Sequence, residues 1–262
     1  MWLVLWLLIP APAFAQTSSP TPDESEINTD RPDFTESSAA VGKGVIQLEG
    51  GFTSGSDHEA GVETNDIRFP QILVRIGLSK RFELRLGGDG FITDDVRPDG
   101  QSDQRTSGFG AISVAGKYVL RDSDEGLSLA VIPILSIPSG SDAFGGSVDP
   151  AVKFTWAHGL PAGFDASGNF NFASVDNNGH RDFLRVASVS FSHALAPKWE
   201  AYWELITAFD SAECACTFDT GVTRLFGRNF QLDVEGGWGL TDSATDWFVG
   251  FGFAVRFPKR AQ

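Results

Sequence analysis

The feature of this 262-residue chain that most restricts its fold is a two-residue alternation of apolar and polar side chains. Residues 82–89 read FELRLGGD, so that apolar and charged side chains take turns. A strand separates such a pattern onto two faces, whereas a helix scatters it around its axis. The same pattern recurs at residues 46–52, 72–78, 112–120, 127–137, 152–156, 164–172, 184–191, 199–209, 218–224, 232–238 and 247–257. It predicts an all-β fold of about twelve strands.

The links between these segments alternate in length. Short links lie at residues 79–81, 121–125, 158–162, 194–198 and 226–229. Between them come generally longer, polar links at residues 54–65, 93–107, 139–149, 174–181, 210–215 and 241–245. Transmembrane up-and-down β-barrels have short turns on the periplasmic side and long loops on the other, an order that a Greek-key sandwich has no reason to keep. The sequence therefore predicts a transmembrane antiparallel barrel of the outer-membrane type over residues 44–257.

The last predicted strand indicates which face would meet lipid. Residues 247–257 read WFVGFGFAVRF, with a continuous apolar side opposite one of Gly, Ala and Arg. In a soluble β fold, the alternative, twelve such apolar faces turned inward would enclose an oversized interior. We therefore expect the apolar faces to contact outer-membrane lipid. Aromatic side chains favour the two membrane interfaces, where we expect Trp156, Trp199, Trp238 and Trp247.

Charged side chains occupy the opposite face of the predicted strands, and we expect them to line the lumen. These candidates are Arg75, Glu83, Arg85, Lys117, Lys153, Glu200, Glu204, Asp233, Glu235 and Arg256. They could form a polar conduit in which an acidic wall faces a basic wall. They could also pair across strands and fill the interior, because an unpaired buried charge is costly. We favour pairing for any single residue, since Arg75 and Glu83 flank one tight turn.

Both ends of the chain fall outside the predicted barrel. Residues 2–9 form an apolar run ahead of Ala13, Phe14 and Ala15, which predicts a signal peptide over residues 1–15 and export. The run is much shorter than the about 18 residues of a spanning helix. Residues 16–43 are expected to form a periplasmic N-terminal segment, and residues 258–262 a C-terminal tail.

Charge and composition exclude several kinds of partner. The chain carries 34 acidic and 20 basic residues, a net charge of -14, whereas nucleic-acid binding depends on Lys and Arg. No nucleic-acid partner and no cofactor are therefore expected. A metal at Cys214 and Cys216 would need more nearby ligands than the sequence offers, so a strained disulfide and two free thiols remain the alternatives. Residues 176–179 lack the closing Glu of a calcium loop and are better explained as a turn.

A motif ahead of the first strand identifies a family. Residues 29–36 read TDRPDFTE, and further matches are GKY at 116–118, IPSG at 137–140, FQLD at 230–233, GLT at 239–241 and VRF at 255–257. Over about residues 27–257 the chain resembles the outer-membrane proteins grouped as "putative MetA-pathway of phenol degradation". The resemblance implies a barrel of about this size that passes small, often aromatic, solutes. The barrel assembly machinery is expected as a further partner of the protein. Barrels of this kind usually end on the terminal aromatic residue, whereas five residues follow it here.

The N-terminal motif itself allows three structural interpretations. Its residues are Asp30, Arg31, Pro32, Phe34, Thr35 and Glu36. The segment could enter the barrel mouth as a plug, with Arg31 pairing a wall carboxylate. It could instead form a receptor-like contact for assembly, or a clasp at the rim. We favour a structural clasp, since the conformational constraint of Pro32 implies no chemistry.

Three functions are compatible with an outer-membrane barrel. A channel for the passive passage of small molecules, including aromatic or hydrophobic ones, is the one that the motifs favour. A closed structural or adhesive barrel is the alternative. A lipid hydrolase is disfavoured, because it needs a nucleophilic Ser beside a His and the chain has no Gly-x-Ser-x-Gly elbow. The four His residues, His58, His158, His180 and His193, all fall in predicted turns or loops. We therefore expect no enzymatic activity.

Overall fold

The computed structural model describes residues 26–123, 126–177, 179–209 and 214–257. The predicted signal peptide and C-terminal tail lie outside these residues. The described strands are β1 (Ile46–Glu59), β2 (Val62–Gly77), β3 (Phe82–Gly88), β4 (Phe91–Pro98), β5 (Gln104–Phe109), β6 (Ile112–Arg121), β7 (Ser128–Ile137), β8 (Asp149–Gly159), β9 (Phe164–Asn177), β10 (His180–Ala196), β11 (Trp199–Phe209), β12 (Cys214–Phe226), β13 (Phe230–Gly239) and β14 (Trp247–Phe257). A single turn of 3-10 helix, η1 (Pro161–Gly163), separates β8 from β9.

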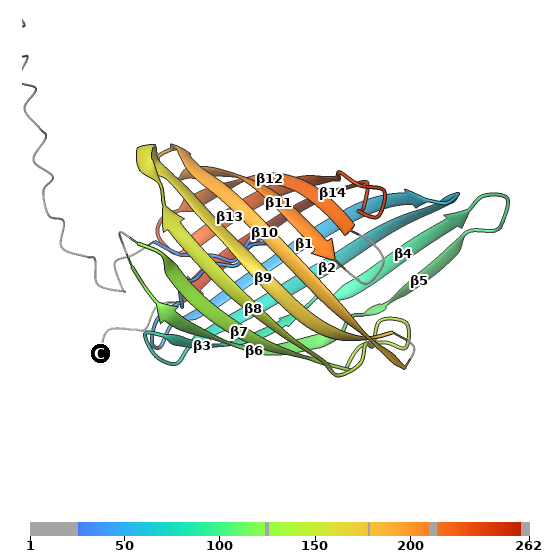
Figure 1. The fold of residues 1–262 in the computed structure, drawn as a ribbon, viewed down its shortest axis with the longest axis horizontal. Coiled ribbons are helices and arrows are strands. Elements are labelled where there is room, and N and C mark those ends of the chain that lie inside the picture. The colour runs from blue at the N-terminus through green and yellow to red at the C-terminus, as the bar shows by residue number, and fades with distance from the viewer. Residues whose placement is uncertain (1–25, 124–125, 178, 210–213, 258–262) are drawn as a thin grey trace, which may run out of the picture.

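The strands form a closed barrel, because β1 pairs with both β2 and β14 (Figure 1). All pairings are antiparallel. The strands β3 and β4 pair with successive halves of β2, and β6 and β5 pair with β3 and β4 in turn. Two wall strands are thus each divided into two pieces, and the fourteen segments make a twelve-stranded barrel. Each of the twelve predicted segments falls on a strand of this wall, and the predicted all-β fold is confirmed.

Most of the predicted long links are shorter than expected. The strands β1 and β2 continue to a two-residue turn at Ala60 and Gly61, whose φ angles of 49° and 79° are those of a tight hairpin. Most of residues 93–107 form the β4–β5 hairpin, which extends beyond the rest of the barrel in Figure 1. Strands that project beyond the membrane meet water on both faces. Their sequence therefore lacks the apolar alternation that marks the wall.

Burial alternates along the wall strands as the two faces require. In β14, Phe251 is 57% exposed on the outer face, whereas Arg256 is 7% exposed on the inner face. Trp199, Trp238 and Trp247 are also exposed on the outside, and Trp156 is half-buried there. Trp199 lies at the end of the wall with the short turns, and the other two exposed residues lie at the opposite end. Among the described residues, no helix is long and apolar enough to span a membrane.

Candidate functional site

The N-terminal segment, residues 26–45, runs inside the barrel. It enters at the short-turn rim, where the Ile27 amide donates to the Arg228 carbonyl (2.8 Å) and Glu26 pairs with Lys198. Deeper in the lumen, the amide of Phe34 donates to the Glu204 carboxylate of β11 (2.8 Å). The favoured interpretation as a clasp at the rim is therefore corrected: the segment has the geometry of a plug, held by polar partners that only the barrel interior provides.

Asp30 is the centre of the contacts between this segment and the basic side of the wall. Its carboxylate lies 2.6 Å from Arg85, 3.2 Å from Lys117 and 3.4 Å from Arg75. All four side chains are almost completely buried. Burial alone would raise the pKa of the Asp30 carboxyl, but these three cations outweigh it and hold the pKa well below its ordinary value. Asp30 is thus bound as a carboxylate.

Glu36 makes a second contact with the same side of the wall. Its two carboxylate oxygens lie 2.9 Å from Arg85 of β3 and 2.6 Å from Lys153 of β8. Burial favours the neutral acid, but Arg85 and Lys153 reverse this effect and lower the pKa of Glu36 to about 2. The segment therefore supplies two carboxylates to four wall cations.

Arg31 points the other way, toward the acidic side of the wall. Its guanidinium lies 3.2 Å from Asp233 and 3.6 Å from Glu235. Two paired glycines, Gly51 of β1 and Gly252 of β14, make room for it. A Cβ atom would lie 2.5 Å from the guanidinium at Gly51 and 2.3 Å from Arg31 Nε at Gly252, so the side chain could not stay in place. The sequence pattern does not single out either glycine, because the role of each depends on a residue far away in the chain.

Thr35 and Asp33 contact the acidic side of the wall in contrasting ways. The Thr35 hydroxyl lies 2.5 Å from both the Glu204 carboxylate and the Ser188 hydroxyl. Asp33 is not ion-paired with any described residue. Burial and the neighbouring carboxylates of Glu204 and Asp219 raise its pKa well above the ordinary value. One position of the segment is therefore electrostatically unfavourable.

Seven of the ten predicted lumen residues are buried within the barrel, Lys153 and Glu235 are half-buried, and Glu200 is exposed. Arg75 pairs with Glu83 (2.9 Å) across one turn, as the pairing interpretation requires. Arg256 donates to Asn229 (2.8 Å) at the rim, and Glu200 lines a cavity. Four of the five basic residues come from β2, β3, β6 and β8, the fifth, Arg256, comes from β14, and most of the acidic ones come from β11 and β13. The two walls have the expected opposite charges, but the segment stands between them and pairs with both.

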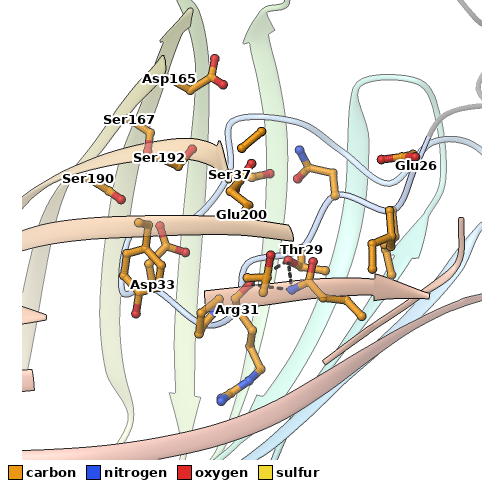
Figure 2. Close-up of a pocket in the computed structure, with 18 of the residues that line it drawn as sticks. Glu26, Thr29, Arg31, Asp33, Ser37, Asp165, Ser167, Ser190, Ser192 and Glu200 are labelled. Carbon is orange, nitrogen blue, oxygen red and sulfur yellow. Dashed lines mark hydrogen bonds between the residues drawn. The ribbon is translucent and has the colours of Figure 1, made fainter. Parts of the chain in front are cut away.

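Three cavities lie in or on the barrel, two of them inside it, toward its opposite ends. A cavity of about 460 Å³ opens at the short-turn end, between the segment and β9–β12 (Figure 2). Toward the other end, a cavity of about 430 Å³ includes Arg68, Asp89 and Ser113. A third, apolar cavity of about 590 Å³ lies on the outer face, beside Ile72, Leu86 and Ile112.

The remaining candidate groups make no site of their own. Both Cys214 and Cys216 are free thiols on β12. Within the described ranges, no three His, Cys, Asp or Glu side chains are placed to hold a metal ion. His193 stacks on Phe164 and its Nδ1 lies 3.0 Å from the Gly163 carbonyl oxygen.

Comparison with known proteins identifies the family. Residues 29–257 match the family described as "Putative MetA-pathway of phenol degradation". The chain belongs to this family. The match begins at Thr29, so it includes the plug motif that the structure places in the lumen. No curated protein sequence matches the chain.

Solved structures similar to this family member are outer-membrane barrels. An outer-membrane channel from Pseudomonas putida F1 is similar over 84% of this chain and 97% of its own, with 13% identity and a TM-score of 0.62. The NanC porin is similar over 82% and 100%, with 8% identity and a TM-score of 0.51. The β domain of the Bordetella autotransporter BrkA is similar over 81% and 99%, with 14% identity and a TM-score of 0.54. At these identities the likeness shows the fold, that of a transmembrane barrel of the outer-membrane type.

Proposed function

We propose that this barrel lies in the bacterial outer membrane and passes small apolar molecules, including aromatic ones, through a break in its wall. The plug, residues 26–45, occupies the axis with ion pairs, which is a poor path for an apolar solute. The observation that carries the proposal is that Gly88 and Gly110 line both the inner cavity and the outer apolar cavity. A solute could therefore move from the lumen to the hydrocarbon at these residues.

The wall is weakly bonded at this point. One divided wall strand is interrupted after Gly88, between β3 and β4, and its neighbour after Phe109, between β5 and β6. Across these two interruptions, the Gly110 amide donates to the Gly90 carbonyl (2.8 Å). Beyond the break, hydroxyls of the β7–β8 loop replace a neighbouring strand. The Ser141 hydroxyl accepts from the Phe109 amide (2.9 Å). Few backbone bonds would have to open here.

The proposed orientation places the short turns and the plug in the periplasm and the β4–β5 hairpin outside the cell, as in barrels of this type. Outer-membrane lipid would then cover the exposed apolar residues of the wall, and the predicted signal peptide would direct export. The family name supports passage of aromatic compounds as the general role. No part of this proposal requires an enzymatic step.

Blocking the break tests the proposal. Gly88→Phe would place a ring at the outer mouth of the break, beside the exposed Ile112, and a Cβ there meets its nearest atom at an ordinary 3.4 Å. Gly236→Phe is the matched control, because Gly236 also lies in a wall strand, β13, with 3.6 Å of room. Intact cells producing each folded protein are assayed for uptake of N-phenyl-1-naphthylamine, an apolar fluorescent probe that outer membranes exclude.

We expect the wild type and Gly236→Phe to accelerate probe uptake and Gly88→Phe to abolish the acceleration. If the wild type has no effect on uptake, the closed structural or adhesive barrel becomes the better interpretation. If Gly88→Phe passes the probe as fast as the wild type, the wall route is wrong.

A further inference from the structure

The cavity at the short-turn end is separate from the proposed wall route and has its own chemistry. It measures about 460 Å³, within the usual range of small-molecule sites, and it reaches the rim beside Ala196 and Lys198. One side is formed by the plug and the other by β9, β10 and β11 (Figure 2). A solute from the short-turn end can therefore reach it without passing the plug.

Hydroxyl groups and carboxylates alternate over the wall side of the cavity. The strand register places Ser192 opposite Asp165 of β9 and Tyr202 of β11. Ser190, two residues earlier in β10, lies opposite Ser167. Figure 2 shows the Asp165, Ser167, Ser190 and Ser192 side chains along this wall. Such a surface offers hydrogen bonds to a ligand that carries several hydroxyl groups.

The negative charge of the cavity is not balanced by protein cations. Among the described residues, none of the lining carboxylates Asp33, Asp165 and Glu200 has an ion-pair partner. The two cations that reach the cavity are already paired: Arg31 with Asp233 (3.2 Å) and Lys198 with Glu26. A cation entering this cavity would therefore find carboxylates without competition from a lysine or an arginine.

A buried hydroxyl is a second, independent observation. The Tyr202 side chain lines the same cavity and is only 3% exposed. Its hydroxyl makes no hydrogen bond of full geometry among the described residues, and the carboxylates that act on it are those of Asp219, Glu235, Glu204 and the cavity residue Asp33. Buried tyrosine hydroxyls usually have a partner, so a polar ligand would satisfy an otherwise unmade bond.

We infer that this cavity binds a small organic cation that carries hydroxyl groups, of about the size of one amino sugar. The ammonium group would lie between Asp165 and Glu200, and the hydroxyl groups would contact Ser167, Ser190 and Ser192. A neutral molecule of the same shape would lose the charge-assisted hydrogen bonds. An acid of the same shape would meet uncompensated carboxylates.

Three matched sugars test the inference by isothermal titration calorimetry on the full, refolded protein. Glucosamine is the cation at about pH 6.5, where its amine is protonated; glucose is the neutral control and glucuronate the anion. We expect glucosamine to bind about tenfold more tightly than glucose and glucuronate not to bind. Equal binding of all three sugars, or no binding of glucosamine, would overturn the inference.

Substitutions locate the site. Glu200→Gln and Asp165→Asn should each weaken glucosamine binding by about tenfold, whereas Glu59→Gln, at the exposed opposite end of β1, should have no effect. Heat-modified gel migration verifies that each variant is folded, and the two cavity variants substitute for each other if one fails to fold. Unchanged binding in a folded cavity variant would contradict the assignment. Neither cavity variant should change uptake of the apolar probe, so the cation site and the wall route are tested independently of each other.

Discussion

At the scale of single residues, Asp30 and Asp33 have the same side chain in opposite environments. Asp30 lies among three cations and Asp33 among carboxylates. Asp30→Asn should lower the free energy of unfolding by about 3 kcal/mol, because it leaves buried cations without their counter-charge. Asp33→Asn should raise it by about 1 kcal/mol, because it removes a carboxyl that is costly to ionise.

Urea unfolding followed by tryptophan fluorescence in lipid vesicles measures both effects, and each variant is the other's control. The opposite signs are the test. If both substitutions destabilised the protein equally, the electrostatic division of the lumen would be wrong.

The pH dependence of plug docking follows from Glu36. Its pKa falls from an ordinary 4.5 to about 2 when docked, so its stabilising effect is complete above about pH 4.5 and is lost as the pH falls toward 2. The lowered pKa of Asp30 acts in the same direction. The raised pKa of Asp33 acts in the opposite direction, so the test is made in an Asp33→Asn background. There we expect protease resistance of the segment to be constant from neutral pH to about pH 5 and to decrease below that. Glu36→Gln should be less resistant at neutral pH and should lose less on acidification; an unchanged acid profile in this variant would contradict the assignment.

The sequence predicts the direction in which a wall side chain points better than it predicts the partner of that side chain. The alternation alone predicts that Arg75, Lys117 and Glu204 point inward, because strand geometry fixes the face of every second residue. It does not predict that Asp30 joins Arg85 and Lys117, since those contacts depend on how a segment without periodicity enters the closed barrel. The space that Gly51 and Gly252 leave for Arg31 is invisible for the same reason.

At the scale of elements, the plug is the part of the fold whose mobility matters most. The hydroxyls of Thr35 and Ser188 lie 2.5 Å apart, so Thr35→Cys with Ser188→Cys should form a disulfide between plug and wall. The background is Cys214→Ser with Cys216→Ser, which removes the native thiols. Under the wall route the plug stays in place, so oxidation should leave uptake of the apolar probe unchanged. Loss of uptake that reduction restores would show that the plug must move.

The divided strands are the elements that the sequence predicts least well. The alternation ends at Gly88, and residues 93–107 carry polar side chains on both faces, a pattern typical of a loop. They nevertheless form β4 and β5, because backbone pairing with β2 and with each other does not require an apolar face. The two-residue alternation of apolar and polar side chains marks a strand only where one face contacts lipid and the other faces the lumen.

At the scale of the whole molecule, the barrel has a charged interior along its axis and an apolar cavity at one side of its wall. The axis is filled by a charged segment that pairs with both walls, whereas Gly88 and Gly110 line both an inner cavity and an apolar outer one. The molecule should therefore exclude polar solutes from the axis while it admits apolar ones at the side.

The most direct measurement compares both solutes in the same cells. Uptake of N-phenyl-1-naphthylamine and of a polar cephalosporin, hydrolysed by a periplasmic β-lactamase, is measured for the wild type and for a variant that lacks residues 26–43. The wild type should accelerate uptake of the apolar probe alone, and the deletion should add uptake of the cephalosporin. Wild-type cells that take up the cephalosporin as readily as the apolar probe would contradict passage through the wall.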